Sequence, residues 1–161
     1  MRGVVPQENR MFKISDIEFE VKNATLDAYI DSDEKLIKWG VEVSAFTISN
    51  EFKRWRPSMK SEVFMATKPN DMKSYLDLSG KSVNWNDKED EDGEPFGELY
   101  VFEHEPLYEC NIQLTEIEDS LFFSLSSKCD VYCVGPPSAA LQVPSLRSCV
   151  MNERLRSLLL Y

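Results

Sequence analysis

The sequence contains a single histidine, His104, so every mechanism that uses a histidine as general base has to use this residue. Glu103 and Glu105 flank it, but neighbouring side chains in a strand point to opposite faces. The three groups therefore do not form a ready-made metal or acid–base cluster, and no HExxH motif is present. We interpret His104 as an ordinary histidine and predict no catalytic residue.

Motifs for nucleotide and acyl-transfer chemistry are also missing. The six glycines form neither GxxxxGK nor GxGxxG, which excludes kinase-like and Rossmann functions. No GxSxG motif exists, and no cysteine lies in a recognisable nucleophile setting. Paired-carboxylate hydrolase chemistry stays open as the least supported class, because 28 acidic residues offer many pairs whose separation the sequence does not give. We predict that the protein is not an enzyme.

The four cysteines are interpreted as buried free thiols, because free cysteine packs as a small hydrophobic residue; they are Cys110, Cys129, Cys133 and Cys149. Three residues of strand character separate Cys129 from Cys133. Four residues of strand span roughly 13 Å, too far for the two thiolates to share a zinc ion. The sequence predicts no metal site and no cofactor.

Residues 86–94, NDKEDEDGE, contain no apolar residue and indicate an exposed loop. If Gly93 were the turn glycine of a calcium loop, Lys88 and Leu99 would occupy the first and twelfth ligand positions, and neither is a suitable ligand. The loop therefore predicts a solvated run of charge.

Charge is distributed unevenly along the chain. Residues 87–119 hold thirteen acidic residues and one lysine, a formal charge of −12, whereas the whole chain carries −10. If these side chains gather on one face, they attract a basic partner, and salt weakens the attraction. The net negative charge of the chain also argues against nucleic acid as a partner, because phosphate binding needs cationic side chains. One basic island is interpreted as a solvated loop; it comprises Lys53, Arg54, Trp55, Arg56 and Lys60.

No run approaches the roughly 18 to 20 apolar residues that span a bilayer, and the first ten residues, MRGVVPQENR, lack the apolar region of a secretion signal. Taking the sequence as the full translated product, we expect a soluble, cytoplasmic protein without membrane contact.

Strand patterns dominate. Apolar residues alternate with polar ones in Phe12–Val21 and again from Trp39 to Ala45, where Trp39 is expected in the core. A turn is predicted at Asp31–Glu34, and a short helix over Asn70–Leu78. The other predicted strands are Glu62–Thr67, Glu98–Glu103, Cys110–Ile117 and Leu121–Val134. The pattern predicts a mainly β fold, an antiparallel β-sandwich or open barrel.

The predicted organisation is a flexible arm at 1–10, a single β-rich domain at 11–135, and a linker with a tail at 136–161. Ser145–Tyr161 places leucines on one helical face, which predicts a C-terminal helix docked on the sheet, a partner-binding tail or an unstructured extension.

These features favour a small acidic protein-binding domain that docks on, and neutralises, a basic protein such as a nuclease-like toxin, in the manner of bacterial immunity proteins. That analogy uses size, acidity and missing catalytic equipment. The expected contact residues are Asp87, Glu89, Asp90, Glu91, Asp92, Glu94, Glu103 and Glu105. The alternative is a β-sandwich that binds carbohydrate or another small ligand, with Trp55 and Trp85 as aromatic platforms.

Overall fold

The computed structural model of the protein describes residues 11–14, 17–49, 54–101, 103–117, 119–130, 139–143 and 150–151. The arm predicted at 1–10 lies outside these residues, as do Lys53, Cys133, Cys149 and most of the predicted tail.

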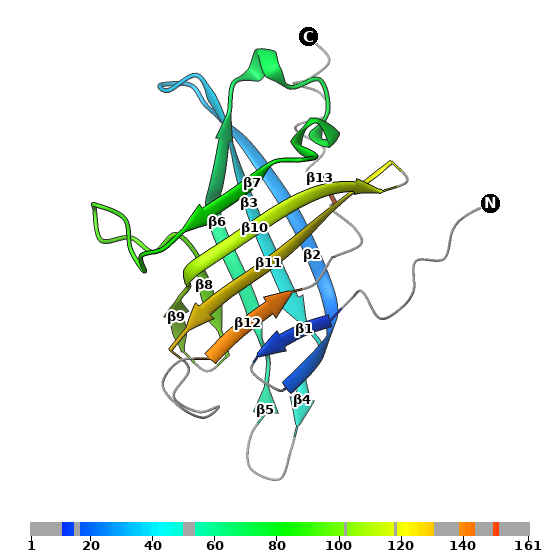
Figure 1. Cartoon of the computed structure of the whole chain (residues 1–161), viewed down its shortest axis with the longest axis vertical. Coiled ribbons are helices and arrows are strands. Elements are labelled where there is room, and N and C mark those ends of the chain that lie inside the picture. Colours follow the sequence, from blue (N-terminus) through cyan, green and yellow to red (C-terminus); the bar gives the residue numbers. More distant parts are fainter. Residues whose placement is uncertain are drawn as a thin grey trace, which may run out of the picture.

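The fold is mainly β, as predicted, and its strands form one strongly curled sheet of eleven strands and a small sheet of two (Figure 1). The long sheet follows the order β7 (Ser82–Trp85), β10 (Tyr108–Ile117), β11 (Ser120–Cys129), β12 (Ala139–Val143), β1 (Met11–Ile14), β2 (Ile17–Asp31), β3 (Leu36–Ala45), β6 (Ser58–Thr67), β8 (Glu98–Tyr100) and β9 (His104–Pro106). Strand β13 (Val150–Met151) pairs with β2, and β4 (Ile48–Ser49) pairs with β5 (Arg54–Trp55).

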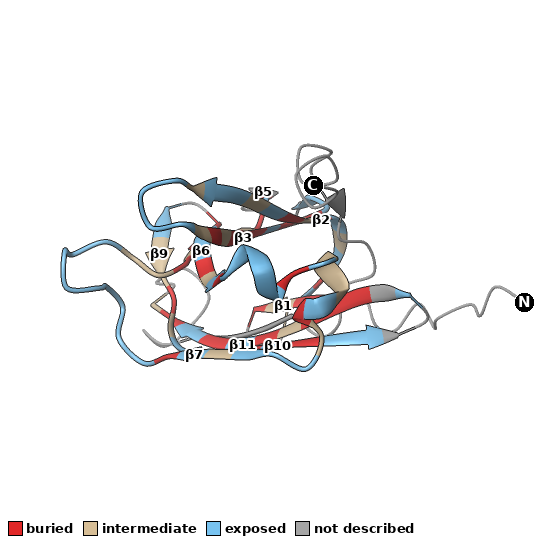
Figure 2. Ribbon diagram, turned by 90° about the horizontal axis from the view of Figure 1, so that it is seen from above, coloured by how far each residue is buried: buried red, intermediate tan, exposed pale blue. Residues whose placement is uncertain are grey.

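Strand β2 forms the corner of the curled sheet. Its first residues, Ile17–Glu20, pair with β1. From Val21 onward β2 pairs with β3, and the register shifts between Val21 and Asn23. Such a shift bends a strand and increases its twist. As a result β3, β6 and β9 form one layer and β7, β10 and β11 face them from the other, with the buried residues between the layers (Figure 2).

The core lies between these layers and includes Trp39, which is fully buried as predicted. The alternation of Trp39, Val41 and Val43 sends these three side chains to the inner face of β3. Burial of an indole requires a partner for its N–H. Trp39 Nε1 donates to Thr67 Oγ1 at 2.8 Å, which ties β3 to the end of β6.

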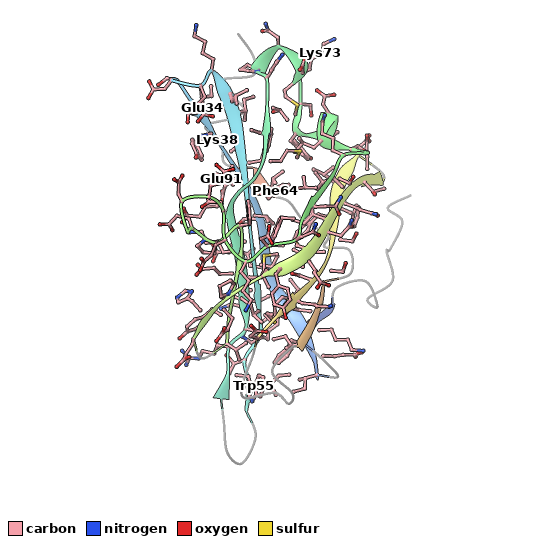
Figure 3. All side chains as sticks on the ribbon, turned by 60° about the vertical axis from the view of Figure 1, so that its left-hand side comes forward. Glu34, Lys38, Trp55, Phe64, Lys73 and Glu91 are labelled. Carbon is pink, nitrogen blue, oxygen red and sulfur yellow. The ribbon has the colours of Figure 1, made fainter. Side chains whose placement is uncertain are left out.

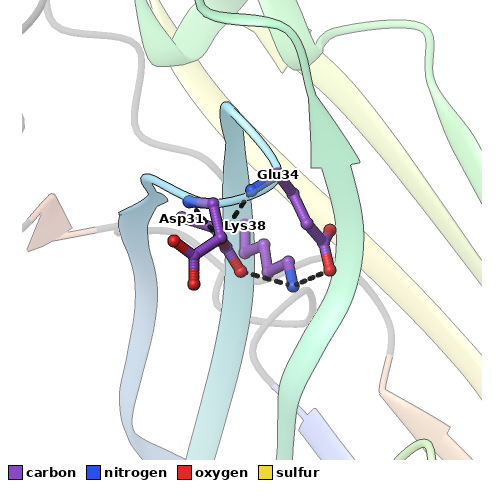
Figure 4. Close-up of polar contacts among 4 residues, drawn as sticks. Asp31, Glu34 and Lys38 are labelled. Atoms are coloured by element: carbon purple, nitrogen blue, oxygen red, sulfur yellow. Dashed lines mark hydrogen bonds and ion pairs between the residues drawn. The ribbon is translucent and has the colours of Figure 1, made fainter.

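The turn predicted at Asp31–Glu34 is confirmed, and it connects β2 to β3 (Figure 4). Asp31 Oδ1 accepts the backbone N–H groups of Asp33 and Glu34, both at 3.0 Å. Lys38 Nζ lies 2.8 Å from Asp31 and 3.1 Å from Glu34. Hydrogen bonds from the Glu34 N–H and from Lys38 lower the pKa of Asp31, which keeps the turn's acceptor charged.

The predicted helix over Asn70–Leu78 is replaced by two short 3₁₀ segments, η2 (Pro69–Asp71) and η3 (Tyr75–Leu78). Met72 between them is extended and buried, which interrupts helical hydrogen bonding. Ser74, rather than Asn70 or Asp71, caps the second segment by accepting the N–H of Leu76. Local side-chain acceptors of this kind compete with a continuous helix.

The C-terminal part differs from the prediction in two places. Ala139–Val143, expected in a linker, form β12 and pair with β11 on one side and β1 on the other. Val150–Met151 belong to the segment predicted as a docked helix, a partner-binding tail or an unstructured extension, and they pair in parallel with Thr25 and Leu26 of β2. Sheet pairing with distant strands overrides a local helical pattern here. Strand β11 ends at Cys129, and the predicted strand residues 131–134 lie outside the described part of the chain. Strand β8 ends at Tyr100, before the predicted end at Glu103.

Candidate functional site

Charged side chains from three strands line up on the outer face of the layer that contains β3, β6, β8 and β9. The pairing registers place Glu42 opposite Lys60, and Lys60 opposite Glu98. Residues two apart in a strand share a face, so Tyr100, paired with His104, lies in the next row. Four strands from three separate regions of the sequence therefore build one polar surface.

This surface has two adjoining hollows, which we call together the acidic groove. The smaller, about 320 Å³, is lined by Glu42, Ser58, Lys60, Glu98, Tyr100 and His104. The larger, about 530 Å³, is lined by Lys60, Glu62, Val63, Asp90, Glu94, Pro95, Phe96, Gly97 and Glu98. The hollows share Lys60 and Glu98, and together they present five carboxylates and one ammonium group.

Lys60 is the cation that lines both hollows. Its ammonium group lies 3.1 Å from Glu62 Oε1, and the hydrogen bond to Glu62 raises the pKa of Lys60, with smaller contributions from Glu42 and Asp27. Lys60 therefore stays charged at neutral pH, and it neutralises one of the surrounding carboxylates. The groove keeps a negative charge.

His104 lies at the rim of the smaller hollow, where 67% of its side chain is exposed. Its Nδ1 is 3.8 Å from Glu98 Oε2, and its ring centroid is 5.0 Å from that of Tyr100. The 3.8 Å separation is longer than a hydrogen bond, and the imidazole is open to solvent. Tyr100 is 39% exposed and offers an aromatic ring to a ligand in the hollow.

The acidic loop, residues 86–97, is held by the side chain of Asp90. Its Oδ1 accepts the N–H groups of Asp92 and Glu94, both at 2.9 Å, and its own N–H donates to the Glu94 carbonyl at 2.8 Å. Gly93 has φ +82°, a conformation that favours glycine. The loop thus presents its carboxylates from a fixed turn (Figure 3).

The base of the loop is fastened to the sheet. Ser61 Oγ donates to the Phe96 carbonyl at 2.6 Å, and Trp85 stacks on Phe96 with ring centroids 5.8 Å apart. Trp85 Nε1 donates to the Leu107 carbonyl at 2.9 Å. A Cβ on Gly97 would lie 3.2 Å from Trp85 Cζ2, so the absence of a side chain at Gly97 allows this close packing.

The residues predicted to contact a partner are only partly brought together. Asp90 and Glu94 line the groove. The others in the loop are exposed beside it; these are Asp87, Glu89, Glu91 and Asp92. Glu103 is exposed next to β9, whereas Glu105 is partly buried on the inner side of this strand. Burial, and then the charges of Glu103 and Asp130, raise the pKa of Glu105.

Two other acidic residues of 87–119, Glu109 and Glu116, do not line the groove. Glu109 on β10 pairs with Lys128 on β11 at 2.6 Å. Glu116 lies near the other end of β10, where its N–H donates to Ser79 Oγ. The β10–β11 turn and the β8–β9 strands lie at opposite sides of the molecule (Figure 1). The described acidic residues of 87–119 therefore do not all gather on one face.

A second polar cluster lies behind the loop. Lys88 contacts Asp130 through a hydrogen bond and lies 5.1 Å from the ring centroid of Tyr108, whose hydroxyl donates to Asp130 Oδ1 at 3.0 Å. The hydrogen bond from Lys88 lowers the pKa of Asp130. The cluster anchors the start of the loop to the end of β11.

The two tryptophans expected as aromatic platforms are buried. Trp55 is 6% exposed and packs near Phe19, with ring centroids 6.1 Å apart, and Trp85 is 8% exposed under Phe96. Polar neighbours in sequence had indicated surface positions, but the inner face of each strand carries the ring into the core. Tyr100 is the aromatic residue exposed in the groove.

Sequence reasoning missed the contribution of Glu42, Glu62 and Lys60. Lys60 had been assigned to a solvated basic loop, yet it belongs to β6 and lies among carboxylates. Alternation with the buried Met59 and Ser61 is the sequence signal for its outward direction. Its strand neighbours are set by long-range pairing, which no local pattern reveals.

Among the described residues, no group of three or more His, Cys, Asp or Glu side chains could hold a metal ion. Cys110 and Cys129 are buried, and burial raises the pKa of each thiol to about 12.

Comparison with known proteins gives no relative: no family model, no curated protein and no solved structure matches this chain. In the part of the chain that the structure describes, no helix has the length and apolar character that crossing a membrane requires.

Proposed function

We propose that this protein binds a basic partner protein through the acidic groove and the adjoining acidic loop. The observation that supports the proposal is the convergence of five carboxylates from β3, β6, β8 and the loop on two hollows that share one lysine. An inhibitor that neutralises a basic protein, such as a nuclease-like toxin, is the form of this function that the protein's size and charge favour.

The physical basis is electrostatic complementarity. A concave surface of one sign concentrates its field and speeds the approach of an oppositely charged protein, and salt screens the effect over about 10 Å at 0.1 M. Such charges set the association rate and partner choice more than the buried area does. Phosphate backbones are repelled by the same field.

The test is affinity capture from a lysate of the source organism with the full chain as bait. A variant reversing three groove charges, Glu62→Lys, Glu94→Lys and Glu98→Lys, removes the field while leaving Asp90, which holds the loop, in place. The matched control reverses three exposed carboxylates that do not line the groove, Glu18→Lys, Glu20→Lys and Glu116→Lys.

The expected result is one basic protein that the wild type and the control retain, that salt releases, and that the groove variant does not retain. Equal retention by both variants, or retention of no basic protein, contradicts the proposal. Because both variants change the net charge equally, a difference between them reports the location of the binding surface.

A further inference from the structure

Within the part of the chain that the structure describes, strand β6 has an edge with no strand partner over its second half. All of β6 runs beside β3, from the pair Ser44 and Ser58 to the pair Ile37 and Thr67. On its other side β6 pairs with β8 only through Ser58–Lys60. Among the described residues, no strand pairs with the outer edge of residues 61–67.

The backbone groups at this edge face away from β3. Met65 and Thr67 lie opposite Trp39 and Ile37 in the ladder. Backbone N–H and C=O groups of successive strand residues point to alternate sides. Ala66, between Met65 and Thr67, therefore directs its N–H and C=O to the open edge, and its side chain is exposed.

Hydrogen bonds at the other end of β3 show which of its residues direct their backbone groups toward β6. Ala45, an even number of residues from Trp39, donates its N–H to the Pro57 carbonyl just before β6 at 2.9 Å. Phe46, the next residue, donates to Glu20 on the β2 side. The odd-numbered residues of β3 thus face β6, in agreement with the direction assigned to Met65 and Thr67.

The larger hollow opens where β8 leaves β6. Ser61 still holds the Phe96 carbonyl, but the chain at Glu94 and Pro95 turns away into the loop. Glu62 and Val63 line the hollow between β6 and the loop, and Val63 is 37% exposed. Figure 3 brings this side forward and labels Phe64 on β6 and Glu91 in the loop. An open strand edge and a negatively charged hollow therefore adjoin.

We propose that the partner adds an extended, cationic segment to the outer edge of β6 at residues 64–67, with arginine or lysine side chains directed at Glu62, Asp90 and Glu94. This mode rests on the proposed function. Strand addition supplies affinity through main-chain hydrogen bonds, and the side chains that face pockets supply specificity. Here the hollow at the end of the edge would select positive charge.

The surroundings of the edge disfavour self-association. A register shift at β6 sets residues 62–64 opposite Gly40, and bulges limit indiscriminate pairing of strand edges. A second copy would bring another chain of formal charge −10 to a negative hollow. A cationic strand avoids the charge repulsion, because its side chains complement the carboxylates of the hollow.

The probe is a synthetic peptide, acetyl-Arg-Val-Arg-Val-Arg-Val-amide, titrated into the full chain at low salt and followed by calorimetry and amide hydrogen exchange. We expect binding, with slower exchange of the Ala66 N–H. Peptides N-methylated on alternate residues lose donors along one edge only. N-methylation of the alternate residues whose N–H groups face β6 should weaken binding by about fivefold to tenfold. N-methylation of the other three residues, whose N–H groups face solvent, should leave binding unchanged.

On the protein side, Ala66→Pro removes the edge N–H, and proline is tolerated at an edge whose N–H faces solvent. Ala66→Thr keeps the N–H and is the matched control. Loss of binding with Ala66→Pro alone supports strand addition; equal binding by both variants, or equal effects of the two N-methylated peptides, overturns it. If Ala66→Pro does not fold, the N-methylated peptides decide the question.

The outcomes also separate this mode from the proposed function. Binding that the Glu62, Glu94 and Glu98 charge reversals abolish, but that Ala66→Pro and N-methylation leave intact, refutes strand addition and leaves the basic-partner proposal standing. Absence of any peptide binding at low salt contradicts both.

Discussion

Replacing Gly40 by alanine is expected to destabilise the fold, because β6 crosses this position closely. A Cβ built on Gly40 lies 2.5 Å from the Glu62 carbonyl oxygen and 3.2 Å from both the Glu62 carbonyl carbon and the Ser61 oxygen. All three are backbone atoms, so no side-chain rotation relieves the clash. A normal carbon–oxygen contact is about 3.3 Å or more, so the two strands would have to separate by about 0.8 Å.

The magnitude follows from two opposing effects. Overpacking of this kind costs about 1–3 kcal/mol, whereas replacing glycine lowers the entropy of the unfolded chain and offsets about 0.4–1 kcal/mol. We expect a net loss of about 1–2 kcal/mol in the free energy of unfolding. For a domain of this length, each 1 kcal/mol lowers Tm by about 2–4 °C.

Urea denaturation of the wild type, Gly40→Ala and the control Ser44→Ala measures this loss. Ser44 is on the same strand, is only half-buried and already carries a Cβ, so its change should stay within about 0.5 kcal/mol. The denaturant dependence of the free energy should be unchanged in all three. A Gly40→Ala midpoint equal to or above that of the wild type would refute the close approach of β6 to β3.

Three further outcomes are expected. Because the pKa of Asp130 is lower in the folded state, its ionised carboxylate stabilises the fold at pH values above the unfolded pKa, and this contribution disappears as the pH falls through the folded pKa. In urea titrations from pH 6 to pH 2, the free energy of unfolding of Asp130→Asn should therefore fall less than that of the wild type. In a variant with Cys133 and Cys149 replaced by serine, Cys110 and Cys129 should resist a thiol reagent at pH 8, because burial raises both pKa values to about 12. Both thiols should react once urea unfolds the chain. Fast labelling without urea would contradict their burial. Trp39→Phe should lower the free energy of unfolding, measured by calorimetry, by about 1–3 kcal/mol, because it leaves Thr67 Oγ1 without its donor. Thr67→Val should lower the free energy of unfolding less in the Trp39→Phe background than in the wild type, because the hydrogen bond is already lost there.

Local patterns in the sequence predict the fold class well. The alternation around Trp39 places its ring in the core, and the polar run Asp31–Glu34 forms the expected turn. Both features depend on neighbours within a few residues. The strand at Ala139–Val143 was missed because it exists through pairing with β11 and β1, and its local sequence carries little strand signal.

The candidate site could be predicted only in part, for the same reason. The loop carboxylates Asp90 and Glu94 were identified by composition alone. The row of Glu42, Lys60 and Glu98 depends on two strand registers that join residues far apart in the sequence. A shift of one residue in either register would send the side chain to the other face, so this part of the groove requires the three-dimensional fold.

The most direct measurement of where a cation binds is a two-dimensional NMR titration of the isotope-labelled chain with hexa-arginine at low salt. The account predicts that amide shifts concentrate on residues 58–62 and 90–98, and that added salt reverses them. Shifts centred on the β10–β11 turn near Glu116 and Asp119, or spread evenly over the acidic surface, would contradict a binding site in the acidic groove.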